Sequence, residues 1–140
     1  MFIIDTNVVS ELRRPSKANP NVLAWARNTA VASVFLSAIT VLELELGALQ
    51  TARNARKDAK QGAALRAWID DQVLLQFDGR ILPVDTVVAQ RCARLHVPDP
   101  RSERDALIAA TALVHGMTVV TRNVRDFERT GVATFNPWIA

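Results

Sequence analysis

The sequence has 140 residues, of which 49% are hydrophobic and 22% charged, which is ordinary for a soluble globular protein. This length fits a single domain, predicted over residues 1–140. No apolar run approaches the ~20 residues that a membrane span needs, and the N-terminus lacks the pattern of a signal peptide. The lone cysteine, Cys92, excludes an internal disulfide and favours a cytoplasmic location.

Lysine and arginine number 17 against 14 aspartate and glutamate, so the chain is modestly basic. Much of the excess lies in two stretches, and both could contact a phosphate backbone. The alternative for each stretch is an ordinary solvated helix face. The first contains Arg13, Arg14 and Lys17, and the second contains Arg53, Arg56, Lys57, Lys60 and Arg66.

Strands and helices are predicted to alternate along the chain. The first half reads as strand Phe2–Ile4, a helix from Asp5 to the Arg14–Pro15 break, a helix from Asn19–Pro20, strand Val34–Leu36 and a helix capped by Thr40. The second half reads as helix Ala59–Phe77, strand Ile81–Val84, a helix from Asp85 to His96, helix Glu103–His115, strand Met117–Thr121 and strand Val132–Phe135. This alternation predicts a three-layer α/β/α domain with a short, mostly parallel sheet flanked by helices.

Acidic residues recur where the apolar runs end or where helices begin. Asp5 follows the first strand, Glu43 and Asp105 lie near helix starts, and Asn123 and Asp126 follow the strand Met117–Thr121. The ends of parallel strands line one crevice, and several carboxylates in one crevice repel one another unless a cation lies between them. A hard divalent ion with oxygen ligands, such as Mg²⁺, is the simplest partner. The pattern therefore favours metal-assisted phosphodiester chemistry.

Helix capping offers an alternative for each of these acids. Asp5 could cap the helix that follows it, while Thr40-x-x-Glu43 and Ser102-x-x-Asp105 have the spacing of a capping box. We favour a site because all three acids would lie at one edge of the sheet. The helix dipole is expected to lower the pKa of a carboxylate in a first turn and keep it ionised.

Four motifs together resemble the PIN-domain ribonucleases, in particular the toxins of VapBC-type toxin–antitoxin pairs. They are Asp5-Thr6-Asn7, Ser37-Ala38-Ile39-Thr40 with Glu43, Asp105 to Ala110, and Thr121-Arg122-Asn123 with Asp126-Phe127. The ending Phe135-Asn136-Pro137-Trp138 is similar to the FitB-like branch. The resemblance implies a PIN-like fold and an endoribonuclease that uses Mg²⁺, for which Mn²⁺ can substitute.

The resemblance also implies roles for individual residues. Asp5, Glu43 and Asp105 match the metal-binding and catalytic acids, with Glu43 as the general base if it is not a direct ligand. Asn123 stands where a fourth acid is common, and we expect it to reach the metal through a water. Asp126 would be a peripheral acid, a cap of the turn before Phe127, or the residue that compensates. Thr6 and Thr121 would orient the carboxylates, or only satisfy local backbone groups.

The implied partners are a VapB-type antitoxin, an RNA substrate, and a second copy of the chain or a toxin–antitoxin hetero-oligomer, with no membrane. Two other functions stay open. One is a non-catalytic RNA- or partner-binding PIN-like module, favoured only by Asn123. The other is a phosphoaspartyl phosphatase of the haloacid-dehalogenase type, which would need an acid at the position of Asn7. We expect Cys92 to be a core residue, and His96 and His115 to be helix-end residues.

Overall fold

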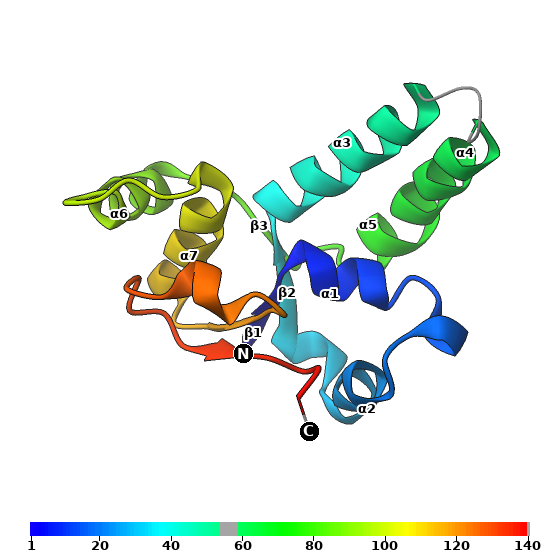
Figure 1. The fold of residues 1–140 in the computed structure, drawn as a ribbon, viewed down its shortest axis with the longest axis horizontal. Helices are drawn as coiled ribbons and strands as arrows, with labels where there is room; N and C mark the ends of the chain where they lie inside the picture. Colours follow the sequence, from blue (N-terminus) through cyan, green and yellow to red (C-terminus); the bar gives the residue numbers. More distant parts are fainter. Residues whose placement is uncertain (54–58, 140) are drawn as a thin grey trace.

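The computed structural model describes residues 1–53 and 59–139 (Figure 1). Within them, five strands form one sheet in the order β3-β2-β1-β4-β5, and each neighbouring pair is parallel. The predicted strands are all present, although the two edge strands are shorter than expected. The strands are β1 (Phe2–Ile4), β2 (Val34–Ser37), β3 (Ile81–Leu82), β4 (Thr118–Val120) and β5 (Thr134–Phe135).

The helices also follow the predicted order. They are α1 (Thr6–Glu11), α2 (Pro20–Asn28), α3 (Ala38–Arg53), α4 (Ala59–Trp68), the π-helical turn η3 (Ile69–Val73), α5 (Leu74–Gln76), α6 (Thr86–Leu95) and α7 (Glu103–His115). Short 3-10 turns lie at η1 (Pro15–Lys17), η2 (Val31–Ser33) and η4 (Val124–Phe127). Asp85 caps α6 through its side chain, as its predicted place at the start of that helix requires, and Asn19 caps α2 in the same way. Gly116 ends α7 with a φ of 66°, a conformation that favours glycine.

The predicted start of α3 is wrong. The helix begins at Ala38, and the N–H of Ile39 donates to Oγ of Ser37 at 3.0 Å, so Ser37 takes the capping role expected of Thr40. Thr40 lies inside the first turn, fully buried, and its hydroxyl has no partner among the described residues. Glu43 therefore lies in the second turn, where a capping box cannot form. Ser102 precedes α7 as predicted, but its hydroxyl makes no capping bond.

Two hydrophobic layers cover the two faces of the sheet. Successive residues of a strand point to opposite faces, and accordingly Ile4 packs toward α1–α5 while Ile3 packs toward α7. In Figure 1, α1 to α5 lie on one side of the strands and α6 and α7 on the other. A third cluster, around Val88 and Cys92, joins α6 to α7. The three-layer α/β/α architecture is thus confirmed. No helix in the described part of the chain is long and apolar enough to cross a membrane.

The register of the two central strands brings distant residues together. Ile4 of β1 is paired with Val120 of β4, so Asp5 and Thr121 leave the sheet side by side. The N–H of Asp5 donates to the carbonyl of Val120 at 2.9 Å, which continues the pairing one residue past β1. β2 lies on the other side of β1 and leads directly into α3, which carries Glu43. The carboxyl ends of the central strands therefore position the acidic residues.

Candidate active site

Asp5 is the most rigidly held of the predicted acids. Its side chain is only 7% exposed. Oδ1 accepts the N–H of Thr6 at 2.8 Å, and Oδ2 accepts the hydroxyl of Thr121 at 2.8 Å. Asp5 does cap α1, as the alternative interpretation proposed. Capping does not require the second bond, however, because Thr121 lies 116 residues away and contacts the oxygen that faces away from the helix amide.

Asn7 ties the two strand ends together, a role that the sequence interpretation did not assign to it. Its side-chain amide donates to Oδ2 of Asp5 and to Oγ1 of Thr121, both at 3.3 Å. Its Oδ1 accepts the N–H of Arg122 at 3.2 Å, and Oγ1 of Thr121 accepts the N–H of Asn123 at 3.0 Å. The only signal in the sequence was the place of Asn7 in the motif Asp5-Thr6-Asn7. The network fixes the orientation of the Asp5 carboxylate.

Thr6 joins Asp5 to Glu43. Its N–H bonds Asp5, and its hydroxyl donates to Oε1 of Glu43 at 2.8 Å. The other oxygen of Glu43, Oε2, lies 3.8 Å from Nη1 of Arg104 on α7. The Glu43 side chain is 25% exposed, so this ion pair is partly desolvated and Glu43 is neither a solvent-facing nor a capping residue. Arg104 was not predicted as a site residue, because nothing in the local sequence distinguishes it from other arginines on a helix.

Asp105 lies in the first turn of α7 and faces the other acids. Its pKa is raised to about 6, chiefly by burial and then by the charges of Asp126, Asp5 and Glu43, against a hydrogen bond from Ser102 that lowers it. The pKa of Asp5 is also raised, chiefly by burial and less by Glu43 and Asp126, against the hydrogen bonds from Thr121 and Thr6. The expectation that the helix dipole would lower the pKa of Asp105 is wrong, because burial and like charge outweigh it. The carboxylates of Glu43 and Asp126 are thus close enough to Asp5 and Asp105 for their charges to act on both.

Asp126 and Asn123 lie on the loop between β4 and β5, and both are exposed. Asp126 is the third residue of the η4 turn, so the interpretation of Asp126 as its cap is wrong. Its charge is the second largest cause of the raised pKa of Asp105, after burial. Asn123 is held near the site through its backbone N–H. The water-mediated role of Asn123 and the role of Asp126 as a fourth acid both stay predictions.

The chemistry of these side chains fits a hard divalent cation. All of the candidate metal ligands are oxygen atoms. Among the described residues, the ion pair of Arg104 with Glu43 at 3.8 Å is the one salt bridge that these carboxylates form, so most of their negative charge is not neutralised. In the described residues, no three of these carboxylates have oxygens all within 4.8 Å of one another. An ion shared by the cluster would therefore contact some of its members through water, which is the usual habit of Mg²⁺.

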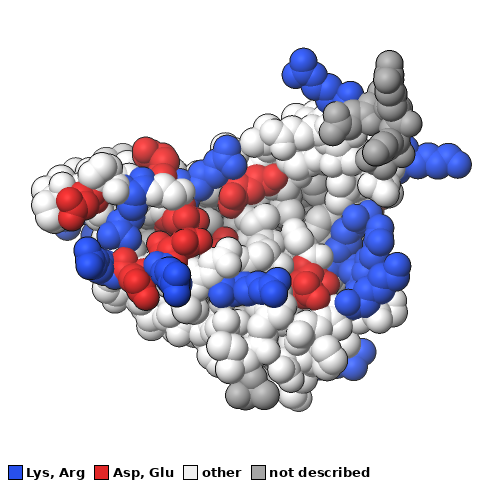
Figure 2. Space-filling model, in the orientation of Figure 1, with Lys and Arg blue, Asp and Glu red and all other residues white. Residues whose placement is uncertain are grey.

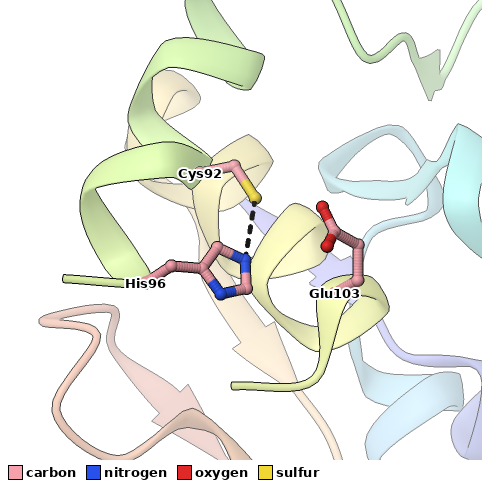
Figure 3. A group of neighbouring side chains, drawn as sticks. All are labelled: Cys92, His96 and Glu103. Atoms are coloured by element: carbon pink, nitrogen blue, oxygen red, sulfur yellow. Dashed lines mark hydrogen bonds between the residues drawn. The ribbon is translucent and has the colours of Figure 1, made fainter. Parts of the chain in front are cut away.

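A second group of possible ligands lies on α6 and α7. Cys92, His96 and Glu103 place one ligand atom each within 4.8 Å of one another (Figure 3). The N–H of Arg101, however, donates to Nδ1 of His96 at 3.2 Å. Nδ1 therefore accepts a backbone hydrogen bond, while Nε2 lies 3.8 Å from Sγ of Cys92. Both ring nitrogens of His96 thus have neighbours within the chain, and no metal is assigned to this group. Cys92 is buried and His96 and His115 lie at helix ends, as predicted.

The second basic stretch is partly neutralised within the chain. Arg66 forms ion pairs with Glu45 and Asp70, the latter at 2.8 Å. The predicted phosphate contacts of Arg56 and Lys57 lie outside the described residues. In the first stretch, the guanidinium of Arg13 lies over the ring of Trp68 at 5.7 Å. Arg66 therefore has acidic partners within the chain. Phosphate binding by the two basic stretches stays a prediction.

Comparison with known proteins gives one consistent result. A model of the "PIN domain" family matches residues 2–133. The toxin FitB of Neisseria gonorrhoeae is 39% identical over 144 residues, covering 99% of each chain, and the VapC ribonuclease Y4jK of Sinorhizobium fredii is 37% identical over 145 residues, covering 99% of this chain and 98% of its own. The crystal structure of FitAcB from Neisseria gonorrhoeae superposes with a TM-score of 0.88 at 38% identity, covering 100% of both chains. The predicted resemblance is confirmed: the chain belongs to the PIN-domain family.

Proposed function

We propose that this chain is a metal-dependent endoribonuclease that acts as the toxin of a type II toxin–antitoxin pair. The observation that carries the proposal is the acidic cluster itself. Asp5, Glu43, Asp105 and Asp126 come from four separate elements, and burial together with the neighbouring charges raises the pKa of Asp5 and of Asp105. Such an arrangement costs stability and needs a functional reason. Relatives named as a toxin and a ribonuclease support the same function.

Each acid would have a distinct part in RNA hydrolysis. Asp5, fixed by Thr6, Asn7 and Thr121, is the rigid group that would hold Mg²⁺, with Asp105 and Asp126 as its neighbours. When bound, a divalent ion supplies positive charge for the scissile phosphate and makes the attacking water more acidic. Glu43 accepts the hydroxyl of Thr6 through Oε1, while Oε2 lies 3.8 Å from Arg104. Glu43 would serve as the general base that takes a proton from the water, if it is not itself a ligand of the ion.

The acidic pocket also suggests how the activity is controlled. A VapB-type antitoxin would place a basic side chain among the carboxylates, because clustered negative charge attracts a basic group. We propose that the chain acts as a homodimer or within a toxin–antitoxin hetero-oligomer. The phosphoaspartyl alternative gains no support, because the residue where it needs an acid is Asn7, whose amide is already bonded to Asp5 and Thr121.

The test is cleavage of a labelled single-stranded RNA by the purified chain without its antitoxin. EDTA should abolish cleavage, and Mg²⁺ or Mn²⁺ added in excess should restore it. Cleavage that continues in excess chelator would refute the metal mechanism. RNA binding without cleavage under any metal would instead support the non-catalytic module.

A further inference from the structure

A cavity of about 600 Å³ lies directly beside the acidic cluster. Asp105 and Asp126 form part of its wall, so it is continuous with the proposed active site. The rest of the wall comes from the end of α6, the 97–101 loop and the η4 turn with the residues that follow it. Its volume lies within the range of pockets that hold small ligands, so it has room for groups about the size of a nucleotide.

One arginine of this wall is structural. Nε of Arg101 donates to the carbonyl of Leu95 at 3.0 Å, and Nη1 donates to the carbonyl of Glu128 at 2.9 Å. Arg101 therefore fastens the end of α6 to the segment after η4, although these lie far apart in the sequence. Because its guanidinium is occupied by backbone carbonyls, it holds the cavity open rather than binding a ligand.

The guanidinium groups of three other arginines in the wall have no hydrogen-bonding or ion-pair partner among the described residues. Arg94, Arg125 and Arg129 are exposed, and within residues 1–53 and 59–139 none of them forms an ion pair or a side-chain hydrogen bond. Figure 2 shows basic side chains around the acidic ones over the part of the face formed by α6, α7 and the C-terminal segments. Asp99 and Glu128 also line the cavity, so the charge is mixed rather than uniformly positive.

The backbone of Arg129 is in an unusual conformation. Its φ is 65°, in the left-handed region that glycine adopts readily and that is less favourable for a residue with a Cβ. The turn is held by Thr130, whose hydroxyl donates to the carbonyl of Phe127 at 2.6 Å and accepts the N–H of Val132 at 3.2 Å. The hydrogen bonds of Thr130 therefore support a turn in which Arg129, rather than a glycine, holds the left-handed position beside the cavity.

We propose that Arg94, Arg125 and Arg129 bind the phosphates of a single RNA strand that runs from the acidic cluster into this cavity. The inference rests on the proposed function, because the scissile phosphate must lie at the acids for the strand to continue here. The arginines sit beside the acids rather than among them, so they position the neighbouring nucleotides and do not touch the reacting atoms. Single strands are favoured because their flexible backbone can bend into the hollow.

The test compares cleavage of a short labelled single-stranded RNA of mixed sequence at saturating Mg²⁺. Arg94→Ala, Arg125→Ala and Arg129→Gly should each raise KM by roughly two- to fivefold, the range of one exposed charge pair, with kcat little changed. The salt dependence of KM should weaken by roughly 0.7 per lost contact on a log–log plot. Arg27→Ala is the matched control, because Arg27 is also an exposed arginine in the last turn of a helix.

Arg129 offers a variant that separates binding from folding. Arg129→Gly should melt at the same temperature as the parent or higher, because glycine relieves the strained φ, while its KM rises. Arg129→Lys, which keeps the charge, should recover most of the affinity. If the parent cleaves RNA and the three variants match Arg27→Ala, this inference is wrong and the proposed function stands. If the parent neither binds nor cleaves RNA, both the proposed function and this inference are wrong.

Discussion

Replacing Asp105 by asparagine should raise the free energy of unfolding at pH 7. Burial and the charges of Asp126 and Asp5 raise the folded-state pKa of Asp105 to about 6, against an ordinary value of 3.8. The folded chain then binds more protons than the unfolded chain between about pH 4 and pH 6, so stability falls as the pH rises through that window. The difference in pKa sets a ceiling of about 3 kcal/mol, and solvent screening of this half-buried group reduces it to about 1–2 kcal/mol.

The assay is thermal unfolding of both proteins from pH 4 to pH 8 in EDTA. At pH 7 the Asp105→Asn variant should melt about 3–6 °C above the parent, given about 3 °C per kcal/mol for a domain of this size. At pH 4 the two should coincide, because the carboxyl of the parent is then largely protonated. Asp71→Asn, at an exposed acid remote from the site, is the charge-matched control and should change little. An Asp105→Asn variant that is less stable than the parent at pH 7 would contradict the picture of a repulsive cluster.

Three further predictions concern the same residues. At a subsaturating, constant Mg²⁺ concentration, kcat/KM for RNA cleavage should rise with pH, because protons compete with the ion for Asp105, whose pKa is raised in the metal-free protein; a pH–rate profile measures it. Thr121→Val should lower the free energy of unfolding in urea by about 1–3 kcal/mol, since the buried carboxylate of Asp5 loses its hydroxyl donor. Asp126→Asn should weaken Mg²⁺ binding, measured by calorimetry, more than Asn123→Ala does; the reverse order would make Asn123 the completing ligand.

The part of the site formed by parallel strands was predictable from sequence. A carboxylate after β1 and a threonine after β4 must emerge at the same edge if the two strands are parallel neighbours, and Asp5 and Thr121 do so. The alternation of strands and helices was enough to predict three layers. Local patterns decided helix starts less well, because Ser37 and Thr40 are both competent caps and only tertiary packing buries Thr40.

Other features of the site depend on contacts between distant segments. Asn7 bonds a strand end 114 residues away, and Arg101 reaches a carbonyl 27 residues away, so neither role has a signal in local sequence. The raised pKa of Asp105 depends on how closely α7 approaches the η4 turn, which periodicity does not specify. The left-handed backbone conformation of Arg129 could not be predicted from the sequence either, because glycine is the residue expected at such a position.

Metal-dependent RNA cleavage by the acidic cluster is tested most simply by single-turnover kinetics. One RNA is cleaved by the parent, Asp5→Asn and Asp71→Asn at the same Mg²⁺ concentration. Asparagine can still cap α1 through its oxygen, so Asp5→Asn should stay folded, which its melting curve will verify. We expect a loss of roughly 100-fold or more for Asp5→Asn, exceeding the usual effect of residues that only support a metal ligand, and no loss for Asp71→Asn. A folded Asp5→Asn variant that cleaves RNA at the parent rate would show that Asp5 is not part of the catalytic site.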